Sequence, residues 1–239
     1  SLTTDSYGSP IRVKDSNSTT GWRDLNFDLA FNGDGTVSPK SGLYSLVISG
    51  GGSAAEVANS GVVRLAASDG SIIGFGWQGD LPKPVLSGST ATYSNVLPNV
   101  DLVIDANQTG FEQYFVLKEK PTADILSALN VPLKTKKVSV TANADGTYSF
   151  SSKSDSSLAE IPLPRIWDSS IEPSSGESVS SSVDSTFSKA ENTISFDNLG
   201  KYFEQPGLVY PVTLDPAVTL SPLSSLYVRN DTPSSSYGN

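Results

Sequence analysis

The sequence predicts an all-β protein, a large antiparallel β-sandwich built of hairpins with at most one short helix. Short apolar runs rich in Val, Ile, Leu, Phe and Tyr recur along the chain, and clusters of Gly, Ser, Asn and Asp separate them. The apolar fraction of 37% and the charged fraction of 17% are typical of a packed globule rather than a disordered chain. We therefore expect a folded domain that fills most of the 239 residues.

The first hundred residues predict a succession of hairpins. Residues Asp24 to Phe31 alternate apolar and polar side chains, which is typical of a half-buried strand. Asn32 to Gly35 follows with residues that tolerate a positive φ, so a turn is expected there. The other strands expected in this part are Leu43 to Ser49, Val62 to Ala66 and Ser71 to Trp77, the last two joined by a turn at Ser68-Asp69-Gly70.

The clearest hairpin is Tyr93 to Lys118. Alternation in its first half places acidic side chains on one face and aliphatic side chains on the other. In one hairpin register, Asp105 faces Glu112 across the pair. The first face carries Asp101, Val103 and Asp105, and the second carries Val100, Leu102 and Ile104.

The second half of the chain predicts one helix and further strands. Pro121 to Asn130 is the helix candidate, with Thr122 as its N-cap. Two prolines fix Ile161 to Asp168 in an extended path along an edge or an open end of a sheet. Ser169 to Ser188 predicts a long Ser-rich surface loop. The expected strands are Lys136 to Ala142 and Thr147 to Ser152, around a turn at Asn143 to Gly146, and then Asn192 to Phe196, Lys201 to Glu204 and Val209 to Asp215.

Composition excludes several chemistries, because the chain contains no His, no Cys and no Met. A Ser-His-Asp or Cys-His nucleophile is impossible, as is a metal site built on imidazole or thiolate. A net charge of -9 argues against a nucleic-acid partner, because phosphate binding depends on Lys and Arg. No apolar run is long enough to predict insertion into a membrane. No signal peptide is visible, so in a secreted protein Ser1 would follow a removed leader or trimmed sequence.

Four separate stretches together resemble the N-terminal β-rich region of large secreted actinobacterial proteins that carry DNRLRE, laminin-G-like or RHS-repeat domains. The likeness covers residues 12 to 216. The stretches are Gly21 to Leu25 with Asp34 to Lys40; Leu81 to Leu86 leading into the Tyr93 to Lys118 hairpin; Pro164-Arg165-Ile166-Trp167-Asp168; and Val209-Tyr210-Pro211-Val212-Thr213-Leu214-Asp215-Pro216.

The end of the chain sets the expected domain boundary. Tyr227 to Asn239 is similar to the opening of a DNRLRE domain. We therefore expect an N-terminal β-sandwich domain over residues 1 to 216, followed by a linker and the start of a DNRLRE-like domain over residues 217 to 239.

The resemblance implies a secreted, extracellular or cell-wall associated product. The primary prediction is a non-enzymatic structural or adhesive module of a bacterial surface protein, with downstream domains of the same polypeptide or neighbouring surface proteins as partners. One alternative is a carbohydrate-binding module for a cell-wall or environmental glycan, with Trp22, Trp77 and Trp167 as the candidate stacking residues. Another is the N-terminal part of an RHS-type toxin carrier. The resemblance implies no catalytic residues and no cofactor.

Several local patterns have both a chemical and a plain interpretation. Asp105 and Glu112 form a carboxylate pair of the kind a glycoside hydrolase needs, although a solvated strand face gives the same pattern, and we favour the latter. The acidic turns Asn32 to Gly35 and Asn143 to Gly146 offer oxygen ligands for Ca²⁺ but lack the further carboxylates of an EF-hand-like loop. Ordinary turn chemistry is the simpler interpretation.

The remaining patterns are weaker. Gly50-Gly51-Gly52-Ser53 lacks the Gly-Lys-Ser/Thr ending of a phosphate-binding loop and a following helix, so a flexible turn is expected. Lys134, Lys136 and Lys137 form a basic cluster that is too small to predict nucleic-acid binding. An isopeptide bond between Lys and Asn or Asp is compatible with a Cys-free extracellular β-domain, but no local signature identifies one.

Overall fold

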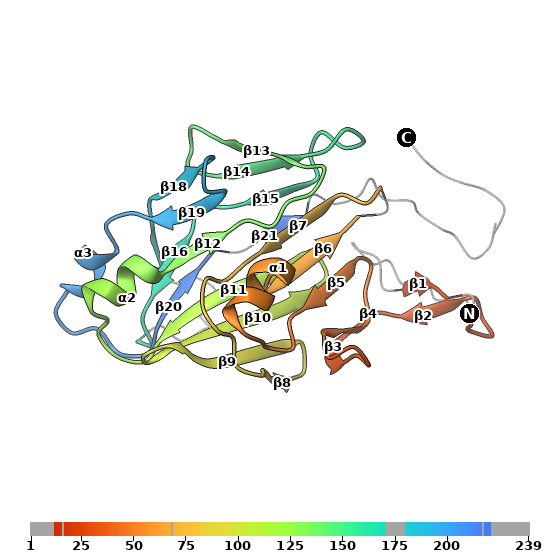
Figure 1. Ribbon diagram of the computed structural model, residues 1–239, viewed down its shortest axis with the longest axis horizontal. Helices are drawn as coiled ribbons and strands as arrows, with labels where there is room; N and C mark the ends of the chain where they lie inside the picture. The colour runs from red at the N-terminus through yellow and green to blue at the C-terminus, as the bar shows by residue number, and fades with distance from the viewer. Residues whose placement is uncertain (1–11, 16, 68, 171–179, 217, 221–239) are drawn as a thin grey trace, which may run out of the picture.

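The computed structural model describes residues 12–15, 17–67, 69–170, 180–216 and 218–220. Over these residues the chain is mostly β-structure, arranged in antiparallel sheets with three short helices. The predicted all-β sandwich is confirmed, and the hairpins that build it follow one another along the sequence (Figure 1).

The main sheet contains eleven strands and has the Tyr93 to Lys118 region at its centre. Its strands are β8 (Val85–Ser87), β9 (Thr90–Leu97), β10 (Val100–Asn107), β11 (Gly110–Leu117), β13 (Ser139–Ala142), β14 (Tyr148–Ser151), β15 (Ala159–Ile161), β16 (Arg165–Trp167), β17 (Ser181–Ser182), β20 (Val212–Asp215) and β21 (Val218–Leu220). Strand β11 pairs with β10 on one edge and with both β20 and β21 on the other.

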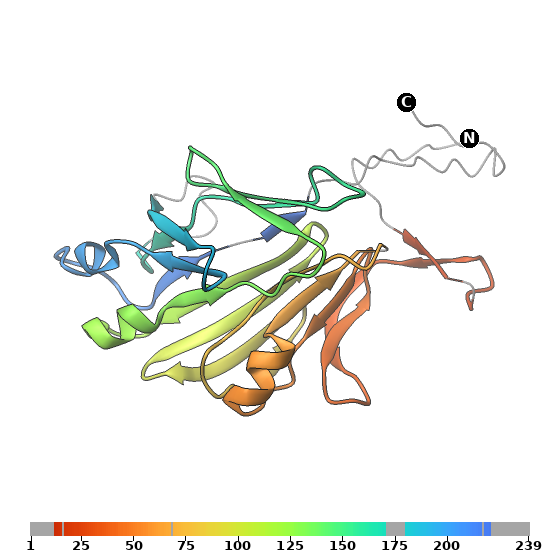
Figure 2. The ribbon, with the colours of Figure 1, turned by 45° about the horizontal axis from the view of Figure 1, so that its top comes forward.

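Two smaller sheets lie side by side against one face of the main sheet (Figures 1 and 2). One consists of β3 (Asn26–Phe31), β4 (Val37–Ser41), β5 (Ser45–Ile48), β6 (Val63–Ala66) and β7 (Ile72–Phe75), and the other of β12 (Asn130–Pro132), β18 (Ser185–Ser188) and β19 (Thr193–Phe196). Isolated bridges from Ile72 to Lys136 and from Phe75 to Leu133 connect β7 to the segment that follows β12. A separate hairpin of β1 (Arg12–Lys14) and β2 (Trp22–Asp24) projects from one end of the molecule.

Aromatic side chains join the layers through the core face of β11. The ring of Phe111 meets Phe75 of β7 edge to face at 5.3 Å between centroids. Phe115 meets Trp77 at 5.9 Å and Phe196 of β19 at 6.5 Å. Both smaller sheets therefore pack on the same strand, and burial of these large rings contributes to the stability of the sandwich.

The hairpin predictions are largely confirmed. The Tyr93 to Lys118 region forms strands β9, β10 and β11, and β10 pairs with β11 from Val100–Leu117 to Asn107–Gly110 without a shift in register. Pairing of β6 with β7 and of β13 with β14 also agrees with the prediction. Helix α2 (Ala123–Ala128) begins at Thr122, whose Oγ1 accepts a hydrogen bond from the Ile125 amide.

Four features differ from the prediction. Helix α1 (Ala54–Ser60) directly follows the Gly50–Ser53 segment, where no helix was expected. Its first turn is capped because the Ser53 amide donates to Glu56 Oε2 and the Ala54 amide donates to Asp80 Oδ1, both at 2.8 Å. Helix α3 (Leu199–Phe203) occupies the segment expected as a strand at Lys201 to Glu204.

The other differences concern β4 and the Ser-rich segment. Strand β4 was not expected, since Pro39 lies within it, yet it pairs with β3 directly after the Asn32 to Gly35 turn. Part of the predicted loop at Ser169 to Ser188 lies outside the described residues, and strands β17 and β18 form within the rest. Strand β21 lies beyond Pro216 and still pairs with β11 and β15, while the proposed boundary near that residue stays a prediction.

A close backbone approach leaves no room for a side chain at Gly50. A Cβ atom at this position would lie 1.8 Å from the carbonyl oxygen of Gly35, so the turn after β3 and the loop after β5 touch through their backbones. We expect Gly50→Ala to lower the free energy of unfolding by about 1–3 kcal/mol, because the two segments must separate. Gly33→Ala is the matched control, since nothing lies within 4 Å of its Cβ position and no positive φ is involved. Urea denaturation of both variants measures the effect, and equal stability of the two would contradict this contact.

Gln113 is a polar side chain in the apolar core. It is 1% exposed on the core face of β11, between Phe111 and Phe115, and neither end of its amide has a hydrogen-bond partner. We expect Gln113→Leu to raise the free energy of unfolding by roughly 1 kcal/mol or more, because an unpaired buried amide is costly. The exposed Gln78→Leu serves as a control that leaves stability unchanged. A loss of stability in Gln113→Leu would mean that ordered water satisfies the amide in solution.

Candidate functional site

The outer face of the main sheet, which points away from the two smaller sheets, brings together the carboxylates singled out in the sequence. Asp105 of β10 lies directly opposite Glu112 of β11, so the register considered above is confirmed. Both side chains alternate with core residues, and both are half-buried. The expectation of an open solvated face is therefore too simple, because neighbouring side chains shield much of each carboxylate from water.

The two opposed carboxylates have different partners. Asp105 Oδ1 accepts hydrogen bonds from Ser89 Oγ at 2.6 Å and from Thr90 Oγ1 at 3.0 Å. Glu112 accepts a hydrogen bond from the hydroxyl of Tyr114. Burial raises the pKa of Glu112, and the nearby charge of Asp105 raises it further. Like charges opposed across a strand pair destabilise one another, so this row favours a bound proton.

A third carboxylate reaches the same face from a distant part of the sequence. Two of the stretches that carry the family resemblance form the adjacent strands β16 and β20, in which Arg165 pairs with Asp215 and Ile166 with Leu214. Ile166 and Leu214 point into the core, so Arg165 and Asp215 lie on the outer face. Burial, followed by the charge of Glu112, raises the pKa of Asp215 to about 7, and Arg165 opposes this shift.

The strand ladder is interrupted beside Asp215. Strand β11 pairs with β20 through residues 115–117 and with β21 through Gly110 and Phe111. Residues 112–114 lie between these two paired segments, opposite residues 215–217 in the same register, and Ala217 lies outside the described residues. Pro216 follows β20 directly and has no N–H to donate, so it removes one hydrogen bond from the ladder at this point. Asp215 Oδ1 is buried here without a hydrogen-bond partner.

Asp215 was expected at the end of a strand, and no chemical role was predicted for it from the sequence. The available signal was an acidic residue at the end of a strand, immediately before Pro216. The strand that pairs with it, β16, could not be identified from the sequence. Chemically, the three carboxylates and Arg165 form a coupled group that can hold and release a proton. Among the described residues, no group of three or more His, Cys, Asp or Glu side chains is arranged to hold a metal ion.

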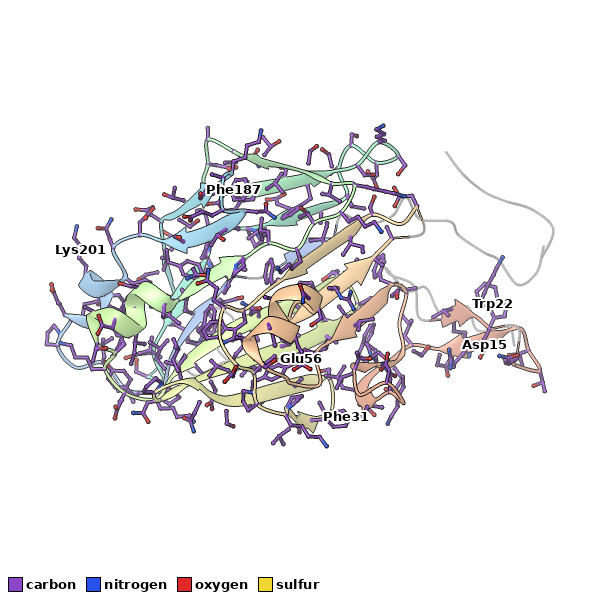
Figure 3. The ribbon with its side chains drawn as sticks, in the orientation of Figure 1. Asp15, Trp22, Phe31, Glu56, Phe187 and Lys201 are labelled. Atoms are coloured by element: carbon purple, nitrogen blue, oxygen red, sulfur yellow. The ribbon has the colours of Figure 1, made fainter. Side chains whose placement is uncertain are left out.

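The three tryptophans do not form a sugar-binding platform. Trp77 is 5% exposed in the core, and Trp22 lies on the projecting β1–β2 hairpin (Figure 3). Trp167 is half-buried on the outer face, where its ring meets Tyr114 at 6.4 Å between centroids and an interplanar angle of 82°. An edge-to-face pair offers no row of coplanar rings for stacking a glycan.

The two acidic turns considered for Ca²⁺ share one hydrogen-bond pattern. Asp34 Oδ1 accepts from the amide and hydroxyl of Thr36, and Asp145 Oδ1 accepts from the same groups of Thr147. These bonds lower the pKa of both carboxylates. One oxygen of each is thereby committed to closing its own turn, which agrees with the simpler interpretation.

The predicted basic cluster is also dispersed into local contacts. Lys134 Nζ donates to the Ala58 carbonyl at 2.6 Å, and Lys137 Nζ donates to the Asp69 carbonyl at 3.0 Å. These two lysines therefore fasten neighbouring segments to each other rather than presenting a continuous charged surface.

The Gly50–Ser53 segment is an ordered turn rather than a phosphate-binding loop. The anion position at the start of α1 is already filled by the carboxylates of Glu56 and Asp80. A hollow of about 310 Å³ lies beside this segment, with Asp34 and Arg64 among the residues that line it.

Lys118 is the lysine placed closest to candidate isopeptide partners. Its Nζ lies 2.7 Å from Asp101 Oδ1 and donates to Asn95 Oδ1 at 3.2 Å. The Lys118 side chain is 41% exposed, so the contact is that of a partly solvated ion pair.

None of the helices in the described part of the chain is long and apolar enough to span a membrane.

Comparison with known proteins gives one informative similarity. No protein-family profile matches the chain, and no solved structure matches it. The tRNA(Glu)-specific nuclease WapA of Bacillus subtilis subsp. natto (strain BEST195) is 27% identical over 148 residues, which span 61% of this chain and 6% of that protein. The chain is thus similar to a small part of a much longer protein.

This similarity corrects the primary functional prediction. We expected a purely structural or adhesive module, whereas the similar protein is named for a nuclease activity. A purely structural role is therefore not supported, and the alternative of a toxin carrier fits better. At 27% identity over 6% of the longer protein, the similarity does not assign a nuclease to this chain.

Proposed function

We propose that this chain is the front portion of a large secreted toxin carrier of the RHS type, and that the toxic activity resides in a part of the polypeptide outside these residues. The alignment with a segment that makes up 6% of a tRNA nuclease carries this proposal. Such a small shared segment is easily accounted for if it belongs to the carrier part of a long protein.

The electrostatics of the chain support this placement of the activity. A tRNA-cleaving surface must attract phosphates, which requires clustered Lys and Arg. This chain has a net charge of -9, and the carboxylates of Asp105, Glu112 and Asp215 lie on its outer sheet face. Phosphates would be repelled from that face, so it is a poor nuclease surface.

The proposed setting is extracellular or wall-associated. A Cys-free sandwich needs no disulfide chemistry to fold after export, and an acidic surface favours solubility. The proposed partners are the following parts of the same polypeptide, including the DNRLRE-like segment suggested from residue 217 onward. This arrangement would present the sandwich ahead of the toxic domain.

Three proteins test the proposal: the full-length gene product, the same product lacking residues 12–220, and the purified chain of 239 residues. We expect the first two to cleave or otherwise inactivate a labelled tRNA pool equally, while the purified chain leaves it intact. Killing of neighbouring cells by the secreting bacterium should be lost with the deletion, because the carrier part is missing.

Two results would overturn the proposal. One is tRNA cleavage by the purified chain that Asp105→Asn or Glu112→Gln abolishes, since the activity would then lie in this domain. The other is a full-length gene product with no toxic activity on tRNA, other nucleic acids or target cells. Circular dichroism of the purified chain confirms that it is folded in each assay.

A further inference from the structure

The hollow of about 310 Å³ beside the Gly50–Ser53 segment lies on the five-stranded sheet. Val47 of β5 and Arg64 of β6 face each other across the strand pair and line it. Their strand neighbours Ile48 and Val63 are buried in the core, so alternation places Val47 and Arg64 on the opposite side of the sheet. The turn after β3, the loop after β5 and the end of α1 form the walls. This volume is near the lower end of the range for ligand pockets, so it suits a small ligand.

Arg64 brings a positive charge without a partner to this hollow. Its cross-strand neighbour on β7 is Gly74, and the stem of Arg64 lies over it, with Cγ 3.1 Å from the position of a Cβ atom at Gly74. Arg64 is half-buried, and within the described residues its guanidinium makes no hydrogen bond and no ion pair. A free planar guanidinium on a stem packed against the sheet can bind a carboxylate or a phosphate through two parallel hydrogen bonds.

Asp34 supplies the opposite charge from the turn after β3. Its Oδ1 accepts hydrogen bonds from the amide and the hydroxyl of Thr36, whereas Oδ2 takes no part in closing the turn. The bonds to Thr36 lower the pKa of Asp34, so it stays ionised near neutral pH. No ion pair joins Asp34 to Arg64, so both charges are available to a ligand. A doubly charged phosphate would be repelled by this carboxylate, which favours a ligand with one negative charge and hydrogen-bond donors.

We propose that this hollow binds a small carboxylate that also carries hydroxyl or ammonium donors, as a sugar acid or an amino acid does. The carboxylate of the ligand pairs with the guanidinium of Arg64, and its donors reach Asp34 Oδ2. Gly50 and Gly51 present backbone without side chains, so the ligand can approach this wall closely. The site goes beyond the proposed carrier role and does not depend on it, because it would recognise a small molecule whichever toxic domain follows.

Three glycine amides report binding directly, because Gly50, Gly51 and Gly61 line the hollow. The purified chain of 239 residues is titrated with D-glucuronate, L-alanine, D-glucose and inorganic phosphate, and proton–nitrogen NMR spectra are recorded. We expect saturable shifts of these amides at millimolar D-glucuronate or L-alanine, none with uncharged D-glucose, and weaker binding of phosphate. The amide of Gly146, in the turn between β13 and β14, is the internal reference and should not shift.

Two variants test the two charges separately. Arg64→Gln removes the guanidinium and should weaken binding about tenfold or more, because a charge-assisted hydrogen-bonded pair is lost. Asp34→Asn keeps the Oδ1 acceptor that closes the turn on Thr36, so it should weaken binding of the carboxylate ligand and strengthen that of phosphate. Arg23→Gln is the matched control and should leave each affinity unchanged, since Arg23 lies on the projecting β1–β2 hairpin.

The outcomes separate the two sources of the ligand. Binding of D-glucuronate alone identifies a sugar acid, binding of L-alanine alone an amino acid, and either result or both support the site. The site is overturned by the absence of saturable shifts with both ligands, by equal binding of D-glucose, by tighter binding of phosphate than of either carboxylate, or by wild-type affinity in Arg64→Gln. Circular dichroism checks the fold of each variant. Should Arg64→Gln not fold, Arg64→Lys replaces it, and loss of the planar fork should still weaken binding.

Discussion

A single strand, β11, sets the constraint on which the rest of the molecule depends. Its core face supplies Phe111 and Phe115 to both smaller sheets, and its two edges pair with β10 on one side and β20 and β21 on the other. A strand used on both edges and one whole face cannot shift by one residue, because every core ring would then turn outward. The continuous register of the β10–β11 hairpin thus fixes the positions of both layers.

The same constraint explains why polar groups are trapped at one place. Strand β11 pairs with β20 and β21 in one register on that edge, and Pro216 between them has no N–H to donate to it. The side-chain amide of Gln113 on the core side and Oδ1 of Asp215 on the outer side are both buried here without a hydrogen-bond partner. Native proteins tolerate few such groups, and those that persist are often tied to a role beyond stability.

Local sequence patterns predicted many of the strands and turns. The pairing of strands that lie far apart in the sequence could not be predicted. Alternation from Val100 to Asp105 and the turn after Asn107 specify the β10–β11 hairpin, and Thr122 marks the start of α2. By contrast, the approach of Arg165 to Asp215 joins residues fifty positions apart through strand pairing that no local signal encodes. Helix α1 had a readable signal in the capping pair Ser53 and Glu56, which the expectation of a flexible turn at Gly50–Ser53 overlooked. Half-burial of Asp105 and Glu112 depends on neighbours from several strands, so alternation alone described their face as solvated.

The position of β21 also has a mechanical consequence. The polypeptide continues from Leu220 into residues 221–239, so tension applied from that direction reaches the sandwich first through β21. Strand β21 has only two register pairs with β11 and two with β15, far fewer than the β10–β11 hairpin has. We therefore expect tension to extract these three residues before it disrupts the aromatic core. The sandwich can lengthen its tether by one short strand and stay folded.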